Sequence, residues 1–163
     1  MNDTIFREVI GTTKEDIVEN IKIDALAYHE AGHAFVAIMT KKIRVIKVFY
    51  DGSSEGYTTA QWDSGDINFE KLCFYLAGEI VEYEFSDQFS ERHAGIDRKI
   101  TEDILFLISG SRSEQYEFWM RAIRTVRSMI NGPESAQKIK KIAEMLMTKG
   151  TLTEEDMNKI MRE

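Results

Sequence analysis

The chain has 163 residues, of which 43% are hydrophobic and 30% are charged, as in an ordinary globular protein with a core of its own. Its formal net charge of −7 argues against a nucleic-acid-binding protein, which normally presents a basic face. We see no apolar run long enough to span a membrane, no signal-peptide pattern and a single cysteine, Cys73, so we expect a cytoplasmic protein without membrane insertion.

We expect one domain over residues 1–163, with a short N-terminal extension over residues 1–12. The first predicted helix is apolar, lacks proline and ends at Lys41-Lys42. Thr13 with Asp16 resembles a capping box, so helical structure is predicted to begin there, with a break before Asp24.

This helix carries the sequence His29-Glu30-Ala31-Gly32-His33, which reads H-E-x-x-H. Residues four apart lie one turn apart on one helix face, so His29 and His33 can bind one Zn²⁺ ion. Glu30 points to a neighbouring sector, where it can act as general base toward a metal-bound water. Val36 and Met39 stand where the extended metzincin pattern requires glycine and histidine, which excludes that class.

Two strands are predicted next, over residues 43–50 and 55–62, joined by a turn at residues 51–54 into a hairpin. In the first strand we expect Val45 and Lys47 on one face, and Ile46 and Val48 on the other. A strand beside a metal site can pair with an extended substrate, whereas a hairpin elsewhere only covers the core. The sequence leaves both roles open.

Helices are predicted over residues 66–85, 96–109, 113–130 and 134–148, with a polar loop over residues 86–94. Asp66 is expected to cap the first of them, and Thr153 with Asp156 to cap a last short helix ending at Met161. The inner side of the first is expected to hold its apolar residues, Phe69, Leu72, Cys73, Leu76, Ile80 and Val81. The predicted fold class is α+β and predominantly α-helical.

A catalytic zinc ion usually has three protein ligands and one open position, so a third ligand is required. The residues alone leave four candidates. Glu79 and Glu82 lie in the helix that follows the hairpin, and Asp97 lies at the start of the next predicted helix. His93 is the third histidine of the chain.

Three segments resemble motifs of the FtsH-type ATP-dependent zinc metallopeptidases. Residues 28–34 (YHEAGHA) are similar to A-x-H-E-A-G-H-A, residues 76–82 (LAGEIVE) to L-G-G-R-x-A-E-E, and residues 94–101 (AGIDRKIT) to G-A-x-N-D-L-x-x-A-T. With the strand pair and residues 152–156, the resemblance extends over about residues 24 to 162. Departures include Ala77 for a glycine, Glu79 for an arginine and Ile96 for asparagine.

The resemblance implies a zincin-like domain in which Zn²⁺ is bound by His29, His33 and Asp97, with Glu30 as base. It also places Glu82 where its carboxylate could hold a ligand histidine by a hydrogen bond without binding the metal itself. The implied function is that of a zinc-dependent metalloendopeptidase acting on peptide or unfolded-protein substrates. The alternatives are a non-cleaving zincin-fold binding or regulatory module and a structural helical protein with a chance motif.

The family carries a membrane anchor and an ATPase module before its peptidase domain. We find neither in this chain, which contains no G-x-x-x-x-G-K-[ST] phosphate loop. A separate ATPase is therefore a conceivable partner, and the family's hexamers make a homo-oligomer conceivable.

Overall fold

A computed structural model describes residues 24–86 and 91–163, and only the backbone over residues 91–94. The described chain is mostly helical with one small sheet, which confirms the α+β class. In chain order its elements are α2 (Ala25–Thr40), β1 (Ile43–Tyr50), β2 (Gly56–Trp62), α3 (Asn68–Phe85), α4 (Glu91–Ile108), α5 (Arg112–Ile130), α6 (Pro133–Lys149), β3 (Thr151–Thr153) and α7 (Glu154–Arg162). None of these helices is long and apolar enough to cross a membrane.

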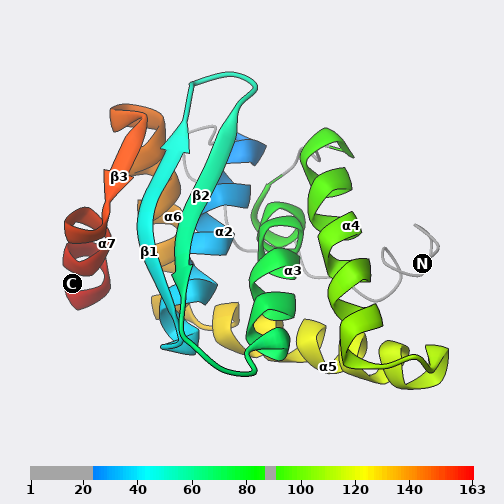
Figure 1. The fold of residues 1–163 in the computed structure, drawn as a ribbon. Helices are drawn as coiled ribbons and strands as arrows, with labels where there is room; N and C mark the ends of the chain where they lie inside the picture. The colour runs from blue at the N-terminus through cyan, green and yellow to red at the C-terminus, as the bar shows by residue number, and fades with distance from the viewer. Residues whose placement is uncertain (1–23, 87–90) are drawn as a thin grey trace.

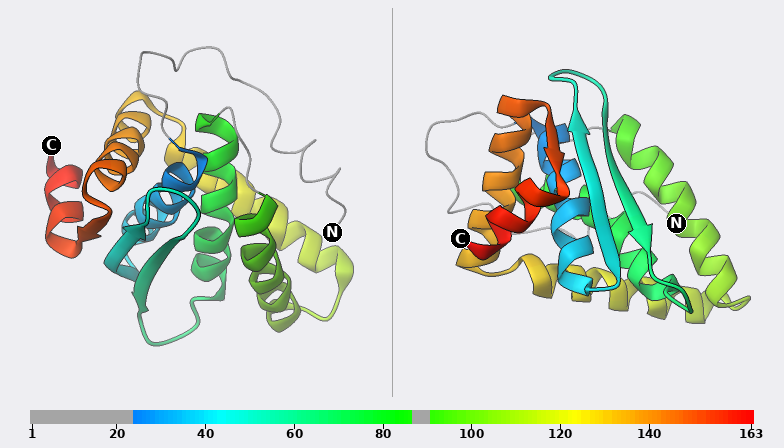
Figure 2. Two further views of the ribbon diagram at one scale, coloured as in Figure 1. Left: turned by 90° about the horizontal axis from the view of Figure 1, so that it is seen from above. Right: turned by 60° about the vertical axis from the view of Figure 1, so that its left-hand side comes forward.

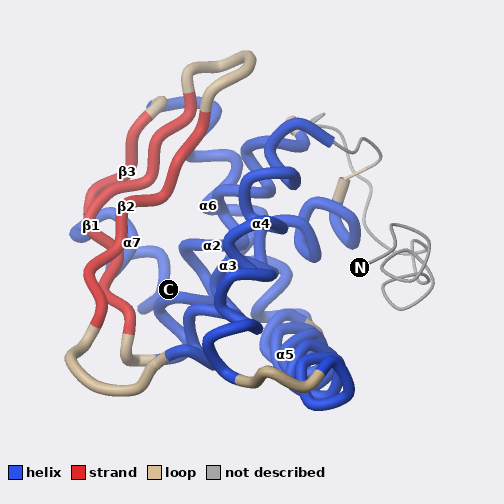
Figure 3. The backbone as a smooth tube through the Cα atoms, turned by 45° about the vertical axis from the view of Figure 1, so that its right-hand side comes forward, coloured by secondary structure: helices blue, strands red, loops and turns tan. Residues whose placement is uncertain are grey.

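The three strands form an antiparallel sheet in the order β2-β1-β3. The sheet covers one side of α2, and α3, α5 and α6 pack around the rest of that helix (Figures 1 and 2). In the tube drawing the sheet lies at the left, with most of the helices beside it to the right (Figure 3). Helix α4 stands farther out, against α3 and to a lesser extent α5.

Helix α2 is the centre of the core, and its residues Ala25–Ala37 are all buried. The Asp24 side chain caps the helix by accepting a hydrogen bond from the Leu26 N–H at 2.9 Å. A Cβ at Gly32 would stand only 2.6 Å from the Ala77 carbonyl oxygen and 2.8 Å from Val81 Cβ. The missing side chain therefore lets α2 and α3 pack closely, which brings the histidines of α2 near α3.

The predicted hairpin is confirmed, but the predicted faces of its first strand are wrong. Pairing of β1 with β2 shifts register between Val45 and Lys47, as at a β-bulge. Ile46 points outward, 39% exposed, and the bulge at this position places Val48 in the core on the same face as Val45. A strict two-residue alternation cannot anticipate this change of phase.

The helix boundaries agree with the prediction to within a few residues, except at the start of the helix that carries Asp97. The predicted loop over residues 86–94 is helical from Glu91 onward, so Asp97 lies in the second turn of α4 and not at its start. The predicted cap of α3 by Asp66 is wrong, because Ile67 is the N-cap residue and its side chain makes no capping hydrogen bond. Asp66 instead accepts a hydrogen bond from the Asn68 N–H at 3.2 Å, just ahead of the helix. Thr153 and Asp156 form the predicted capping box of α7.

Strand β3 was not anticipated, because three residues between two helices carry no strand pattern of their own. It pairs with β1 from Lys47 to Phe49, and Gly150, at φ 72°, ends α6 just before it. The predicted capping box at Thr13 and Asp16, and the extension over residues 1–12, lie outside the described residues.

Candidate metal centre

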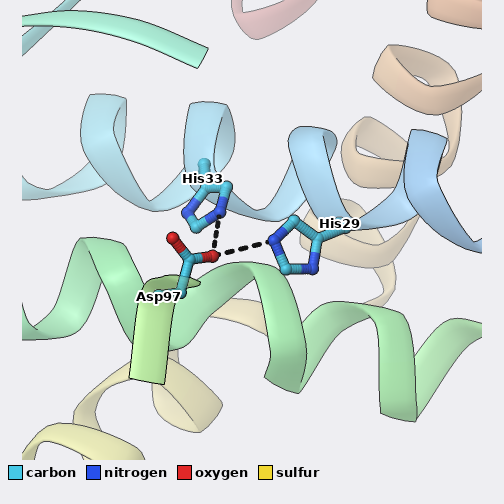
Figure 4. Close-up of side chains that lie close together, drawn as sticks. All are labelled: His29, His33 and Asp97. Carbon is cyan, nitrogen blue, oxygen red and sulfur yellow. Dashed lines mark hydrogen bonds and ion pairs between the residues drawn. The ribbon is translucent and has the colours of Figure 1, made fainter. Parts of the chain in front are cut away.

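Two helices bring three metal-ligating side chains together. His29 and His33 extend from α2, and Asp97 approaches them from α4 (Figure 4). Asp97 Oδ2 lies 2.9 Å from His29 Nε2 and 3.0 Å from His33 Nε2, and the three ligand atoms all lie within 4.8 Å of one another. Atoms that share one zinc ion at about 2 Å stand roughly 3 Å apart, so the Asp97–histidine separations match a common metal.

The other nitrogen of each ring is held by an acceptor from α3. His29 Nδ1 lies 3.0 Å from Glu82 Oε2, and His33 Nδ1 lies 2.7 Å from the Phe74 carbonyl oxygen. Carbonyl and carboxylate oxygens only accept, so each Nδ1 donates its proton, and with a metal bound each Nε2 would present its lone pair to it. This tautomer is the one a metal ligand needs.

The charges of the cluster favour a cation between the three ligand atoms. Burial alone would lower the pKa of His29, but its hydrogen bonds to Asp97 and Glu82 outweigh burial and raise the pKa to about 10. Burial alone would raise the pKa of Asp97, but the charge of His33 and the hydrogen bonds from both histidines hold that pKa below its usual range. The negative charges of Asp97 and Glu82 keep a proton on His29 in this structure. A divalent cation bound at the same place would balance those charges instead.

A glycine on α3 leaves room beside the two ligand nitrogens. A Cβ at Gly78 would stand 2.5 Å from His33 Nε2 and 2.6 Å from His29 Nε2. Any side chain at position 78 would overlap the two Nε2 atoms, which face Asp97. Together with the donor set of two imidazoles and one carboxylate, this space fits a zinc ion.

Glu30 is buried next to the histidines and is fixed by β2. The Thr58 hydroxyl donates to Glu30 Oε2 at 2.7 Å. A Cβ at Gly56 would lie 2.9 Å from Glu30 Cγ, so the bare backbone of β2 packs directly on the Glu30 side chain. Glu30 therefore has one preferred position, on the wall of the groove that also contains both histidines and Asp97.

That groove has a volume of about 380 Å³ and runs between β2 and the N-terminal half of α4. Since β2 is an outer strand of the sheet, one of its backbone edges is not paired with β1. The rest of the groove wall is largely apolar or aromatic, with Tyr57, Ala60, Trp62, Phe74, Tyr75, Ile96 and Ile100.

The other predicted ligand candidates lie elsewhere. Glu82 contacts the far nitrogen of His29, as expected of a residue that supports a ligand. Glu79 forms an ion pair with Arg98, and burial raises its pKa although Arg98 acts in the opposite direction. The side chain of His93 lies outside the described residues.

Three groups that support these residues were not predicted from the sequence. Thr58 on β2 contacts Glu30, the Phe74 carbonyl on α3 contacts His33, and Arg98 on α4 contacts Glu79. None has a local signal, because each is recognisable only from its distant partner. Gly78 does have one, since a glycine inside an apolar helix often marks a close approach.

Comparison with models of protein families gives no match. The chain is 31% identical over 81 residues to the ATP-dependent zinc metalloprotease FtsH of Mycoplasma pneumoniae, and 30% identical over 81 residues to that of Mycoplasma genitalium. Each alignment covers 47% of this chain but only 11% and 12% of the relatives. The chain is thus similar, over about half its length, to a small part of two zinc metalloproteases.

Proposed function

We propose that this protein is a zinc-dependent metalloendopeptidase with a zincin-like domain, in which His29, His33 and Asp97 bind the metal. The observation that carries the proposal is the convergence of these three side chains within 4.8 Å, from two separate helices, in the groove that also contains Glu30. The partial similarity to two FtsH metalloproteases supports the same reading.

Zinc at such a site lowers the pKa of bound water and polarises a carbonyl group. In the proposed reaction, Glu30 accepts a proton from the attacking water and delivers it to the leaving amine. Thr58 orients Glu30 by donating to one carboxylate oxygen, which leaves Oε1 for the proton transfer. Glu82 and the Phe74 carbonyl keep the two imidazoles in the tautomer that presents Nε2.

The proposed substrate is an extended peptide segment, as found in unfolded protein. Its backbone would pair with the outer edge of β2, and its side chains would lie against the aromatic and apolar groove wall. A folded domain would not enter a groove of about 380 Å³, so we propose that unfolding comes first. A separate ATPase partner, a homo-oligomer and a cytoplasmic location stay predictions.

The test combines zinc content with hydrolysis of an unfolded protein. Wild type is expected to bind one zinc ion and to cleave, whereas His33→Ala should lose the zinc. Glu30→Gln should keep the zinc but lose roughly 10²–10⁴-fold in kcat, because a general base contributes about that much. Glu117→Gln, the same change at an exposed helical site, is the matched control and should retain full activity.

Two results would contradict the proposal in different ways. A wild-type protein without stoichiometric zinc would show that the three side chains are not a metal site. Zinc binding without hydrolysis that depends on Glu30 would instead identify a binding or regulatory module that does not cleave.

A further inference from the structure

Asp97 is the one proposed ligand that is not on α2, so its position depends on how α4 is held. Among residues 95–108 of α4, whose side chains the structure describes, the buried ones are Thr101, Ile104 and Leu105, in the C-terminal half of the helix. In the half that carries Asp97, none of residues 95–100 is fully buried. Core packing therefore holds α4 mainly from Ile100 onward, and the ligand lies on the N-terminal side of these contacts.

An ion pair joins the N-terminal half of α4 to α3. Arg98 Nε lies 3.1 Å from each carboxylate oxygen of Glu79, and Arg98 Nη2 also donates to Oε1. The Glu79 side chain is only 3% exposed and that of Arg98 is 30% exposed, so the contact is largely shielded from water. A guanidinium that contacts both oxygens fixes direction as well as distance, which a lysine cannot do.

Both ends of this pair are adjacent in sequence to the site. Arg98 follows Asp97, and Glu79 follows Gly78, the residue beside the two ligand nitrogens. Neighbouring residues on a helix point about 100° apart, so Arg98 can reach α3 while Asp97 reaches the histidines. A shift of α4 along or away from α3 would break the ion pair and withdraw Asp97 together.

We propose that Arg98 and Glu79 are positioning residues, which hold the N-terminal half of α4 on α3 and thereby place Asp97 against His29 and His33. This inference rests on the proposed zinc site and adds to it the interaction that determines its third ligand. Neither residue binds the metal in this proposal.

The experiment measures zinc affinity by competition with a chelator of known Kd. The decisive variant is Glu79→Met/Arg98→Met, which removes both charges and leaves neither one buried alone. Replacing a buried ion pair with apolar side chains commonly preserves folding. We expect zinc binding about tenfold weaker or more, the lower limit seen when residues that support metal ligands are changed. Arg98→Lys, which keeps the charge but not the planar fork, should fall between the double variant and wild type.

A second ion pair provides the matched control. Arg127 Nη2 lies 2.9 Å from Glu84 Oε1 and joins α5 to α3, with side chains 28% and 17% exposed. Glu84→Met/Arg127→Met should bind zinc as wild type does, which shows that loss of an ion pair on α3 is not enough.

Wild-type zinc affinity in Glu79→Met/Arg98→Met would overturn the inference while leaving the proposed function intact. Equal weakening in the control variant would overturn it as well, because the effect would then be general. Absence of zinc from the wild-type protein is a separate outcome that removes the proposed function and this inference together.

Discussion

His29 and His33 face Gly78 on α3, and the proposed zinc site depends on the lack of a side chain at this position. A side chain at position 78 would overlap both Nε2 atoms. The neighbouring residues of α3 carry side chains that are buried in the core. The site thus needs space at one residue and a ligand atom at three others.

Replacing Gly78 with alanine should weaken zinc binding even though alanine favours a helix more than glycine does. In an ordinary helix interior, Gly→Ala stabilises by roughly 0.5–1 kcal/mol. In Gly78→Ala the new methyl group would displace both imidazoles, so we expect a clear loss of zinc affinity and no gain in stability. Gly95→Ala on α4, where a Cβ meets nothing within 4 Å, is the control and should stabilise without weakening zinc binding. Titration calorimetry with zinc and thermal unfolding measure both effects, and unchanged affinity in Gly78→Ala would contradict the described geometry.

At this scale the sequence predicted His29, Glu30 and His33 from spacing alone, since the pattern is local to one helix. Asp97 came from the family resemblance, because from the residues alone it was one of four candidates. The partners that hold these groups could not be predicted. The Thr58–Glu30 hydrogen bond and the Arg98–Glu79 ion pair each join residues on separate elements, and only the fold brings them together.

Among the elements, the long amphipathic helices were predicted well, because apolar periodicity and caps are local properties. The start of α4 was predicted too late, since its first turn is polar and offers no apolar repeat. The bulge in β1 and the three-residue strand β3 depend on pairing with other strands, which no single segment encodes.

The cap of α7 gives a pH dependence that belongs to one element. Lys149 and the Thr153 backbone and hydroxyl groups lower the pKa of Asp156 to about 2, and burial acts in the opposite direction. A carboxylate with a lowered pKa stabilises the fold above its unfolded pKa of about 4, and this contribution is lost as the pH falls from about 4 to about 2. Asp156→Ala should therefore cost about 1 kcal/mol at pH 7, as loss of a helix cap does, and much less at pH 2.

Urea unfolding of both proteins across this pH range measures the difference. Asp103→Ala, at an exposed position of α4, is the control and should change stability by less than about 0.5 kcal/mol at either pH. A penalty for Asp156→Ala that stayed constant from pH 7 to pH 2 would exclude the charge as its origin.

For the whole molecule, the proposed metal would join the central helix to the outermost one. Metal that binds only the folded state stabilises it by about 2.7 kcal/mol when free zinc is a hundred times Kd. For a domain of this size, removing that zinc should lower Tm by roughly 5–10 °C. Calorimetry with and without a chelator measures the shift. His33→Ala should show no chelator effect, and an equal shift in that variant would mean that the chelator acts elsewhere.

The burial of α2 on every side also affects how this protein should be studied by mutation. Because the same thirteen residues, Ala25–Ala37, form both the middle of the core and the proposed site, a random screen for inactive variants would collect two kinds of defect in one helix. Some variants would fail to accumulate, and others would accumulate but not react. Only substitutions that keep side-chain volume, read together with protein abundance, can assign a lost activity on α2 to chemistry.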